Sequence, residues 1–114
     1  MNETFRLGKP PVIGILSLGL TPRPDLEEAV DRAVPGARLR VRGGLDGLAQ
    51  AELDALGRGK PSYPLMVRLA DRSSREVDMH ELLPHLTRQG ETLCRDGAQC
   101  IVLACSGGFP EFRL

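Results

Sequence analysis

The hydrophobic positions along the chain predict four strands. Residues 11–19 (PVIGILSLG) form an unbroken apolar run that is typical of a strand buried on both faces of a parallel sheet. Residues 37–44 (ARLRVRGG) alternate between arginine and apolar side chains, which predicts an edge strand with one polar face. Residues 64–70 (PLMVRLA) and 99–105 (QCIVLAC) are the third and fourth strands.

Helical spacing of apolar residues separates these strands. We expect a first helix from Pro24 to about residue 33, ended by Pro35 and Gly36, and a short helix over residues 48–56. The longest candidate covers residues 78–95, where Asp78 followed by Glu81 resembles a capping box. A brief strand at residues 76–77 precedes it, and Pro84 predicts a kink or a later start of this helix.

The alternation of strands and helices predicts an α/β fold. Right-handed crossovers would give a three-layer sandwich with a mainly parallel four-stranded sheet between helices. The length of 114 residues fits a single α/β domain, residues 1–114, without a linker or repeat.

Composition narrows the classes of function. Fifteen basic residues balance fifteen acidic ones, which argues against a nucleic-acid or membrane-surface partner. No apolar stretch is long enough to span a membrane. The three cysteines, Cys94, Cys100 and Cys105, have spacings that fit neither a disulfide framework nor a standard zinc site. We therefore expect a cytoplasmic protein with reduced thiols, no metal and no cofactor.

The carboxyl ends of parallel strands form the usual ligand edge of such a sheet. Cys105 comes directly after the fourth strand, and a following helix amino terminus would make its thiolate more available. Ser106 and the backbone N–H groups of Gly107 and Gly108 would then bind a carboxylate. The alternative is that Cys105 is a small buried residue without a chemical role.

Polar residues after the other three strands are candidate ligands for the same anion. Thr21 and Arg23 offer a hydroxyl and a guanidinium, although the same turn also fixes the start of the helix. Asp46 lies between glycines, where it either serves the site or only stabilises its turn. Arg68 is unusual within a strand, and its structural explanation is pairing with Asp71 or with another carboxylate at a strand end.

Four sequence blocks in this order resemble the AroM family. They are SLGLTPRPD after the first strand, GGLDGL after the second, LMVRLAD at the third and LACSGGFP at the end. The resemblance spans residues 12–112.

The resemblance implies more than the residues alone. AroM-like proteins are about twice as long and resemble aspartate/glutamate/hydantoin racemases, in which two similar α/β halves face each other across a cleft. Each half commonly supplies one cysteine for cofactor-independent proton transfer at the carbon beside a carboxylate. The chain would then be a truncated amino-terminal half. The resemblance makes Cys105 the catalytic residue and matches the three loops at Thr21, Arg23, Asp46, Arg68 and Asp71.

Three functional hypotheses remain open from the sequence. The first is a racemase-like enzyme acting on a small carboxylate, incomplete in this chain. The second is a non-catalytic protein that binds a small anionic metabolite or regulates aromatic amino-acid metabolism, and the third is a vestigial fragment. Because a missing second half would leave apolar surface exposed, we expect a homodimer or larger assembly.

Overall fold

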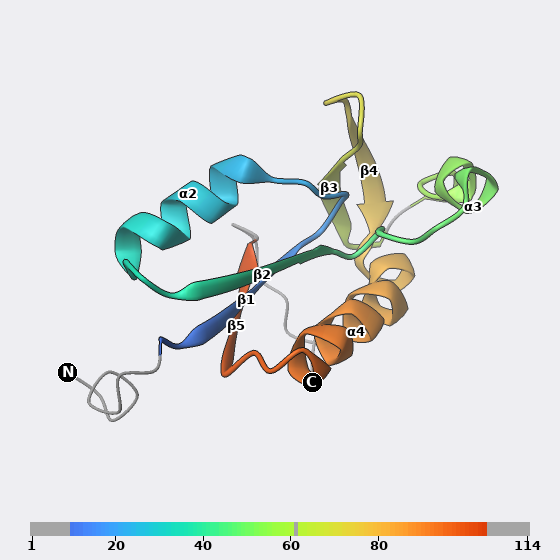
Figure 1. The fold of residues 1–114 in the computed structure, drawn as a ribbon. Helices are drawn as coiled ribbons and strands as arrows, with labels where there is room; N and C mark the ends of the chain where they lie inside the picture. Colours follow the sequence, from blue (N-terminus) through green and yellow to red (C-terminus); the bar gives the residue numbers. More distant parts are fainter. Residues whose placement is uncertain (1–9, 61, 105–114) are drawn as a thin grey trace.

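The computed structural model describes residues 10–60 and 62–104 of the chain. Two sheets and three helices make up this part of the protein (Figure 1). In chain order the elements are β1 (Val12–Ser17), α2 (Pro24–Ala33), β2 (Arg38–Gly43), α3 (Gln50–Ala55), β3 (Pro64–Arg68), β4 (Ser74–Asp78), α4 (Met79–Arg95) and β5 (Cys100–Ala104). Every strand and helix expected from the hydrophobic pattern is present, with small differences at its ends.

The parallel sheet is built around the apolar strand β1. Its strand order is β2-β1-β5, and both neighbours run parallel to β1. Ile15 and Leu16 are fully buried, as expected for a strand covered on both faces. The strand ends at Ser17, which lies in register with Gly43 of β2 and Ala104 of β5. The carboxyl ends of all three strands therefore meet at one edge.

Helices cover both sides of this sheet. Figure 1 shows α2 on one side and α4 on the other. Gly14 of β1 allows α4 to approach, because a Cβ there would lie 3.2 Å from the side chain of Leu93. The expected α/β class with a parallel sheet between helices is confirmed for the described residues.

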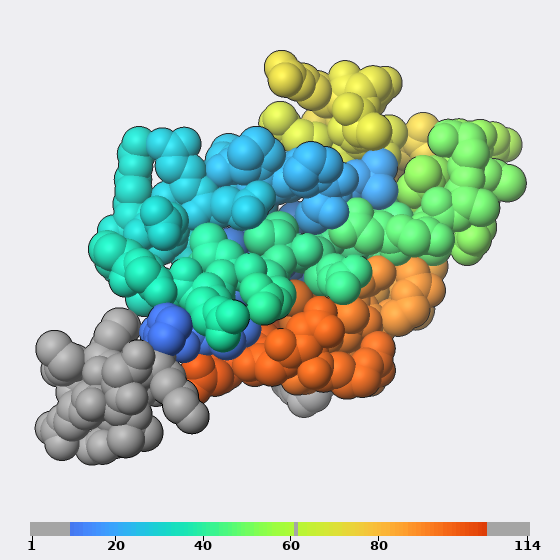
Figure 2. Space-filling model, viewed as in Figure 1, coloured from blue at the N-terminus to red at the C-terminus, as the bar shows by residue number. Residues whose placement is uncertain are grey.

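The third expected strand is not part of the parallel sheet, so the prediction of one mainly parallel sheet of four strands is wrong. β3 instead pairs with β4 as a two-stranded antiparallel sheet. Its side chains alternate, with Leu65 and Val67 buried in the core and Met66 59% exposed. An antiparallel sheet can have one face on the core and the other in solvent, which suits the alternating side chains of β3. Pairing with β4 across a short turn also costs little loop entropy. Figure 2 shows this hairpin, in yellow, projecting from the rest of the described chain.

The long helix α4 begins with the capping box that the sequence predicted. The Asp78 carboxylate accepts a hydrogen bond from the backbone N–H of His80 at 3.0 Å, and Asp78 N–H donates to Glu81 at 3.3 Å. Pro84 lies inside the helix, which continues without a break from Met79 to Arg95. The apolar face of α4 is fully buried at Leu82, Leu86 and Leu93. These side chains belong to one hydrophobic core that includes residues of both sheets.

Candidate functional site

The loops that follow β1 and β2 are joined through Asp46. One carboxylate oxygen of Asp46 accepts a hydrogen bond from Thr21 N–H at 3.0 Å. The other accepts from the Thr21 hydroxyl at 2.6 Å and from Gly43 N–H at 2.7 Å. The structure thus brings these two predicted site residues together as partners of each other. Their hydrogen bonds connect the loop after β1, which includes Arg23, to the end of β2.

A buried glutamine, which sequence reasoning missed, supports the same loop from the other side. Gln89 lies on the apolar face of α4 and is only 8% exposed. Its amide donates a hydrogen bond to the Asp46 carbonyl at 3.0 Å. The sequence does contain a signal for it, because Gln89 shares the core-facing side of the helix with Leu86 and Leu93. A buried amide at such a position needs a hydrogen-bond partner.

Arg23 is held in place at the start of α2. Its Nε and Nη2 donate to the two carboxylate oxygens of Asp25 at 3.0 and 2.8 Å, and its side chain is only 21% exposed. The hydrogen bond with Asp25 raises the pKa of Arg23, partly offset by burial. The same contact lowers the pKa of Asp25 to about 2, so both groups are charged at neutral pH.

Arg68 reaches the same edge from the antiparallel sheet. Its carbonyl accepts a hydrogen bond from Leu20 N–H at 3.1 Å, which ties the end of β3 to the loop after β1. Gly19 makes this approach possible, because a Cβ at that position would lie 2.1 Å from the Arg68 carbonyl oxygen. Arg68 therefore joins the site although β3 lies outside the parallel sheet.

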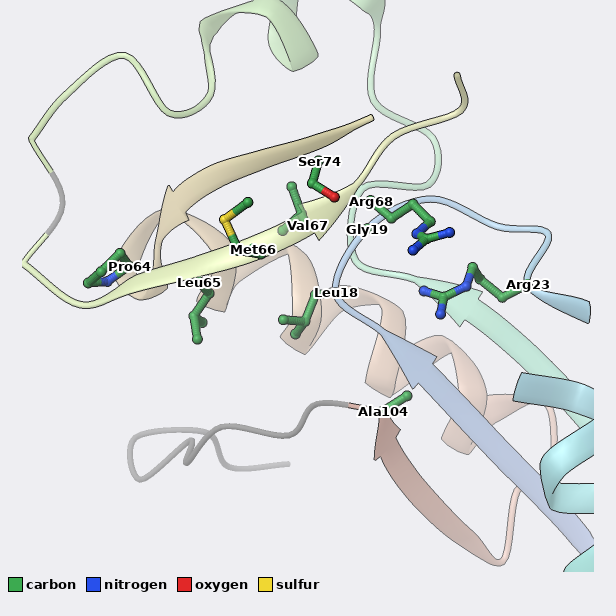
Figure 3. Close-up of a pocket in the computed structure, with 10 residues that line it drawn as sticks. All are labelled: Leu18, Gly19, Arg23, Pro64, Leu65, Met66, Val67, Arg68, Ser74 and Ala104. Carbon is green, nitrogen blue, oxygen red and sulfur yellow. The ribbon is translucent and has the colours of Figure 1, made fainter. Parts of the chain in front are cut away.

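A hollow of about 410 Å³ opens between the hairpin and the end of β1. In Figure 3 the guanidinium groups of Arg23 and Arg68 extend into the same space beside Gly19, with Ala104 below them. Among the described residues that line it, these two arginines are the charged ones. Its other lining residues are Leu18, Pro64, Leu65, Met66, Val67 and Ser74.

A second hollow, of about 530 Å³, is lined by the same two arginines. It is bounded by the loop over residues 20–25 and by residues 68–72, which include Arg72. Arg68 and Arg72 have no carboxylate partner among the described residues, whereas Arg23 is paired with Asp25. The combined lining is therefore positively charged, with three arginines and one aspartate, in a chain of zero net charge.

Asp71 does not join the two arginines. Its carboxylate accepts hydrogen bonds from the backbone N–H and the hydroxyl of Ser73 within the hairpin turn. These bonds lower the pKa of Asp71, led by the hydroxyl. The expected pairing with Arg68 is not found in the described part of the chain, and Asp71 instead stabilises its own turn.

The cysteine turn, with Cys105, Ser106 and Gly107, lies outside the described residues. Ala104, which immediately precedes Cys105 in the sequence, lines the hollow of about 410 Å³. Across residues 10–60 and 62–104, no cluster of three or more His, Cys, Asp or Glu side chains is arranged to hold a metal ion. Within the same residues, no helix has the length and apolar character needed to cross a bilayer.

The family model described as AroM protein matches residues 13–114, which is most of the chain. No curated protein and no solved structure matched the sequence.

Proposed function

Given that the chain belongs to the AroM family, we propose that it binds a small carboxylate between Arg23 and Arg68 and that Cys105 supplies acid/base chemistry there. One observation carries this proposal. The two guanidinium groups line the same hollow as Ala104, the residue directly before Cys105. A racemase-like reaction without a cofactor is the activity that these parts support best.

The chemistry of the hollow favours a carboxylate as ligand. A guanidinium presents a planar fork of N–H donors that matches two carboxylate oxygens. The volume of about 410 Å³ is in the range of small-molecule sites. Apolar walls from Leu18 and Leu65 reduce competition from water and strengthen the attraction between opposite charges.

The proposed reaction begins with proton removal from the carbon next to the bound carboxylate. The Cys105 thiolate accepts this proton, and the electron pair of the broken C–H bond is delocalised into the carboxylate held by the arginines. Nearby positive charge favours the thiolate form of a cysteine. Inversion needs a second acid that returns a proton to the opposite face, from a second copy or a second half. We therefore expect no racemisation of free amino acids by a single 114-residue chain.

Binding without catalysis is the second candidate. It would make the chain a sensor or carrier of a small anion linked to aromatic amino-acid metabolism. The observation that favours it is that Arg23 and Arg68 line one hollow with apolar walls, which is sufficient to bind an anion, whereas the reaction needs Cys105 in addition.

We also propose that the protein is a homodimer located in the cytoplasm. Met66 and Val102 are large apolar side chains that are 59% and 42% exposed, and contact with a second copy would remove apolar area of this kind from water. Light scattering at tens of micromolar protein tests this part of the proposal. A dimer mass is expected, and a monomer mass would contradict it.

Proton exchange separates the enzyme from the binding protein. The chain is incubated in D₂O with a panel of L- and D-amino acids, and loss of the α-proton signal is followed by NMR. One base is sufficient for exchange, whereas racemisation requires two. We expect exchange that is abolished in Cys105→Ser and strongly reduced in Arg68→Gln.

Each outcome of that experiment has a distinct meaning. Saturable binding without exchange would replace the enzyme by the binding protein. Exchange that persists in Cys105→Ser would contradict the role of the thiol. If Arg68→Gln bound the ligand as tightly as the wild type does, the proposed carboxylate site itself would be contradicted. Cys94→Ser is the matched control, because it removes a thiol elsewhere in the chain.

A further inference from the structure

Arg72 occupies a backbone conformation that is unfavourable for an arginine. It lies in the turn between β3 and β4 with φ of 69°, in the left-handed region. Hydrogen bonds from Arg72 N–H to the Leu69 carbonyl (3.0 Å) and from Leu69 N–H to the Ser73 carbonyl (2.9 Å) fix this turn. Glycine, asparagine or aspartate is the usual residue at such a position, because a Cβ is crowded against the backbone there and only the short polar side chains offset this by local hydrogen bonds. Local strain of this kind is frequent at functional sites.

Arg72 also borders one of the two hollows that Arg23 and Arg68 line. Arg72 lines the hollow of about 530 Å³ together with Arg23 and Arg68. The one acidic residue of that lining, Asp25, is engaged by Arg23. Arg68 and Arg72 have no carboxylate partner among the described residues, so two positive charges border this hollow without compensation, and an anion between them would relieve their repulsion. A single carboxylate would leave part of this positive charge without a partner.

We propose that Arg72 forms a second anion-binding position and that the ligand is a compact dianion. One acidic group binds between Arg23 and Arg68, and the other binds Arg72 in the second hollow. This inference rests on the proposed carboxylate site and specifies the class of its ligand. A dicarboxylate and a phosphorylated carboxylate share this chemistry.

Matched ligand pairs test the second position. Isothermal titration calorimetry at low salt compares valerate with glutarate, which replaces the terminal methyl by a second carboxylate, and with phosphoglycolate. We expect the wild-type chain to bind glutarate or phosphoglycolate at least tenfold more tightly than valerate. The better of the two dianions identifies whether the second group is a carboxylate or a phosphate.

Substitutions at Arg72 separate its two properties. Arg72→Asn removes the charge and suits the left-handed conformation, so the free protein should melt at a slightly higher temperature while losing the preference for dianions. Arg72→Lys retains the charge and should retain most of the preference. Arg38→Gln is the control, since it removes an exposed charge at the opposite end of the sheet. Binding of valerate should be unchanged in all three variants.

The results distinguish this inference from the function on which it rests. Equal binding of valerate and both dianions by the wild-type chain would overturn the second position and leave the carboxylate site standing. A dianion preference that survives Arg72→Asn would also overturn it. Absence of binding by every ligand would overturn both proposals.

Discussion

The contact between Gly19 and Arg68 joins the two sheets at the proposed site, so replacing Gly19 by alanine is a direct perturbation of the architecture. An added Cβ would lie 2.1 Å from the Arg68 carbonyl oxygen and 2.8 Å from the Arg68 nitrogen. Both atoms are backbone, so no flexible side chain can move aside. Either the end of β3 or the loop after β1 must shift.

The size of the effect follows from what such a shift disrupts. The hydrogen bond from Leu20 N–H to the Arg68 carbonyl would be lost, at a cost of about 1 kcal/mol. Overpacking of a tight contact adds about 2 kcal/mol. Together these give a loss of about 3 kcal/mol in the free energy of unfolding, which corresponds to a decrease in Tm of about 12 °C for a domain of this size.

Thermal unfolding followed by circular dichroism measures this loss. Gly59→Ala is the matched control, because a Cβ at Gly59 would meet nothing within 4 Å and its φ is not in the left-handed region. We expect Gly19→Ala to melt well below the wild type and Gly59→Ala to melt close to it. If the two variants melted together, the β3–β4 hairpin would not dock on the loop after β1 as described.

Three further predictions concern other contacts of the fold. Asp46→Ala removes the acceptor of three hydrogen bonds, so urea unfolding should show a decrease of about 3 kcal/mol in the free energy of unfolding. Asp54→Ala, at an exposed position, is the control and should have little effect, and equal decreases in the two variants would contradict the role of Asp46. The pKa of Asp78 is lowered to about 2 by hydrogen bonds led by Tyr63 N–H, so its contribution to stability is complete above its ordinary value of 3.8 and disappears as the pH falls through about 2. Asp78→Asn should therefore weaken the decrease in Tm between these pH values, and an unchanged pH profile would refute this. Ser17→Ala should be neutral or stabilise by up to about 1 kcal/mol, because no described residue hydrogen-bonds to the buried Ser17 hydroxyl; marked destabilisation would show that the hydroxyl has a partner.

Local features of the fold could be predicted because each depends on neighbouring residues. The apolar run in β1, the arginine alternation in β2 and the Asp78–Glu81 capping box identify their elements directly. The partner of β3 could not be predicted in this way. A period of two shows that a strand has one buried face, but it does not show which strand pairs with it.

The site was predictable in its location and less so in its contacts. Parallel strands bring their carboxyl ends together, so the meeting of Thr21 and Asp46 follows from the topology. That these two bond to each other, and that Arg23 is held by Asp25, depends on side-chain geometry that a sequence does not specify. Whether Cys105 acts on a ligand bound there stays a prediction.

The central claim is that a carboxylate binds between Arg23 and Arg68, and an NMR titration of the ¹⁵N-labelled chain with glutarate tests it most directly. Saturable shifts should concentrate on the backbone amides of Gly19, Arg68 and Ala104, and Arg68→Gln should abolish them while Arg38→Gln leaves them intact. Shifts that do not saturate, or that centre on another part of the molecule, would contradict the claim.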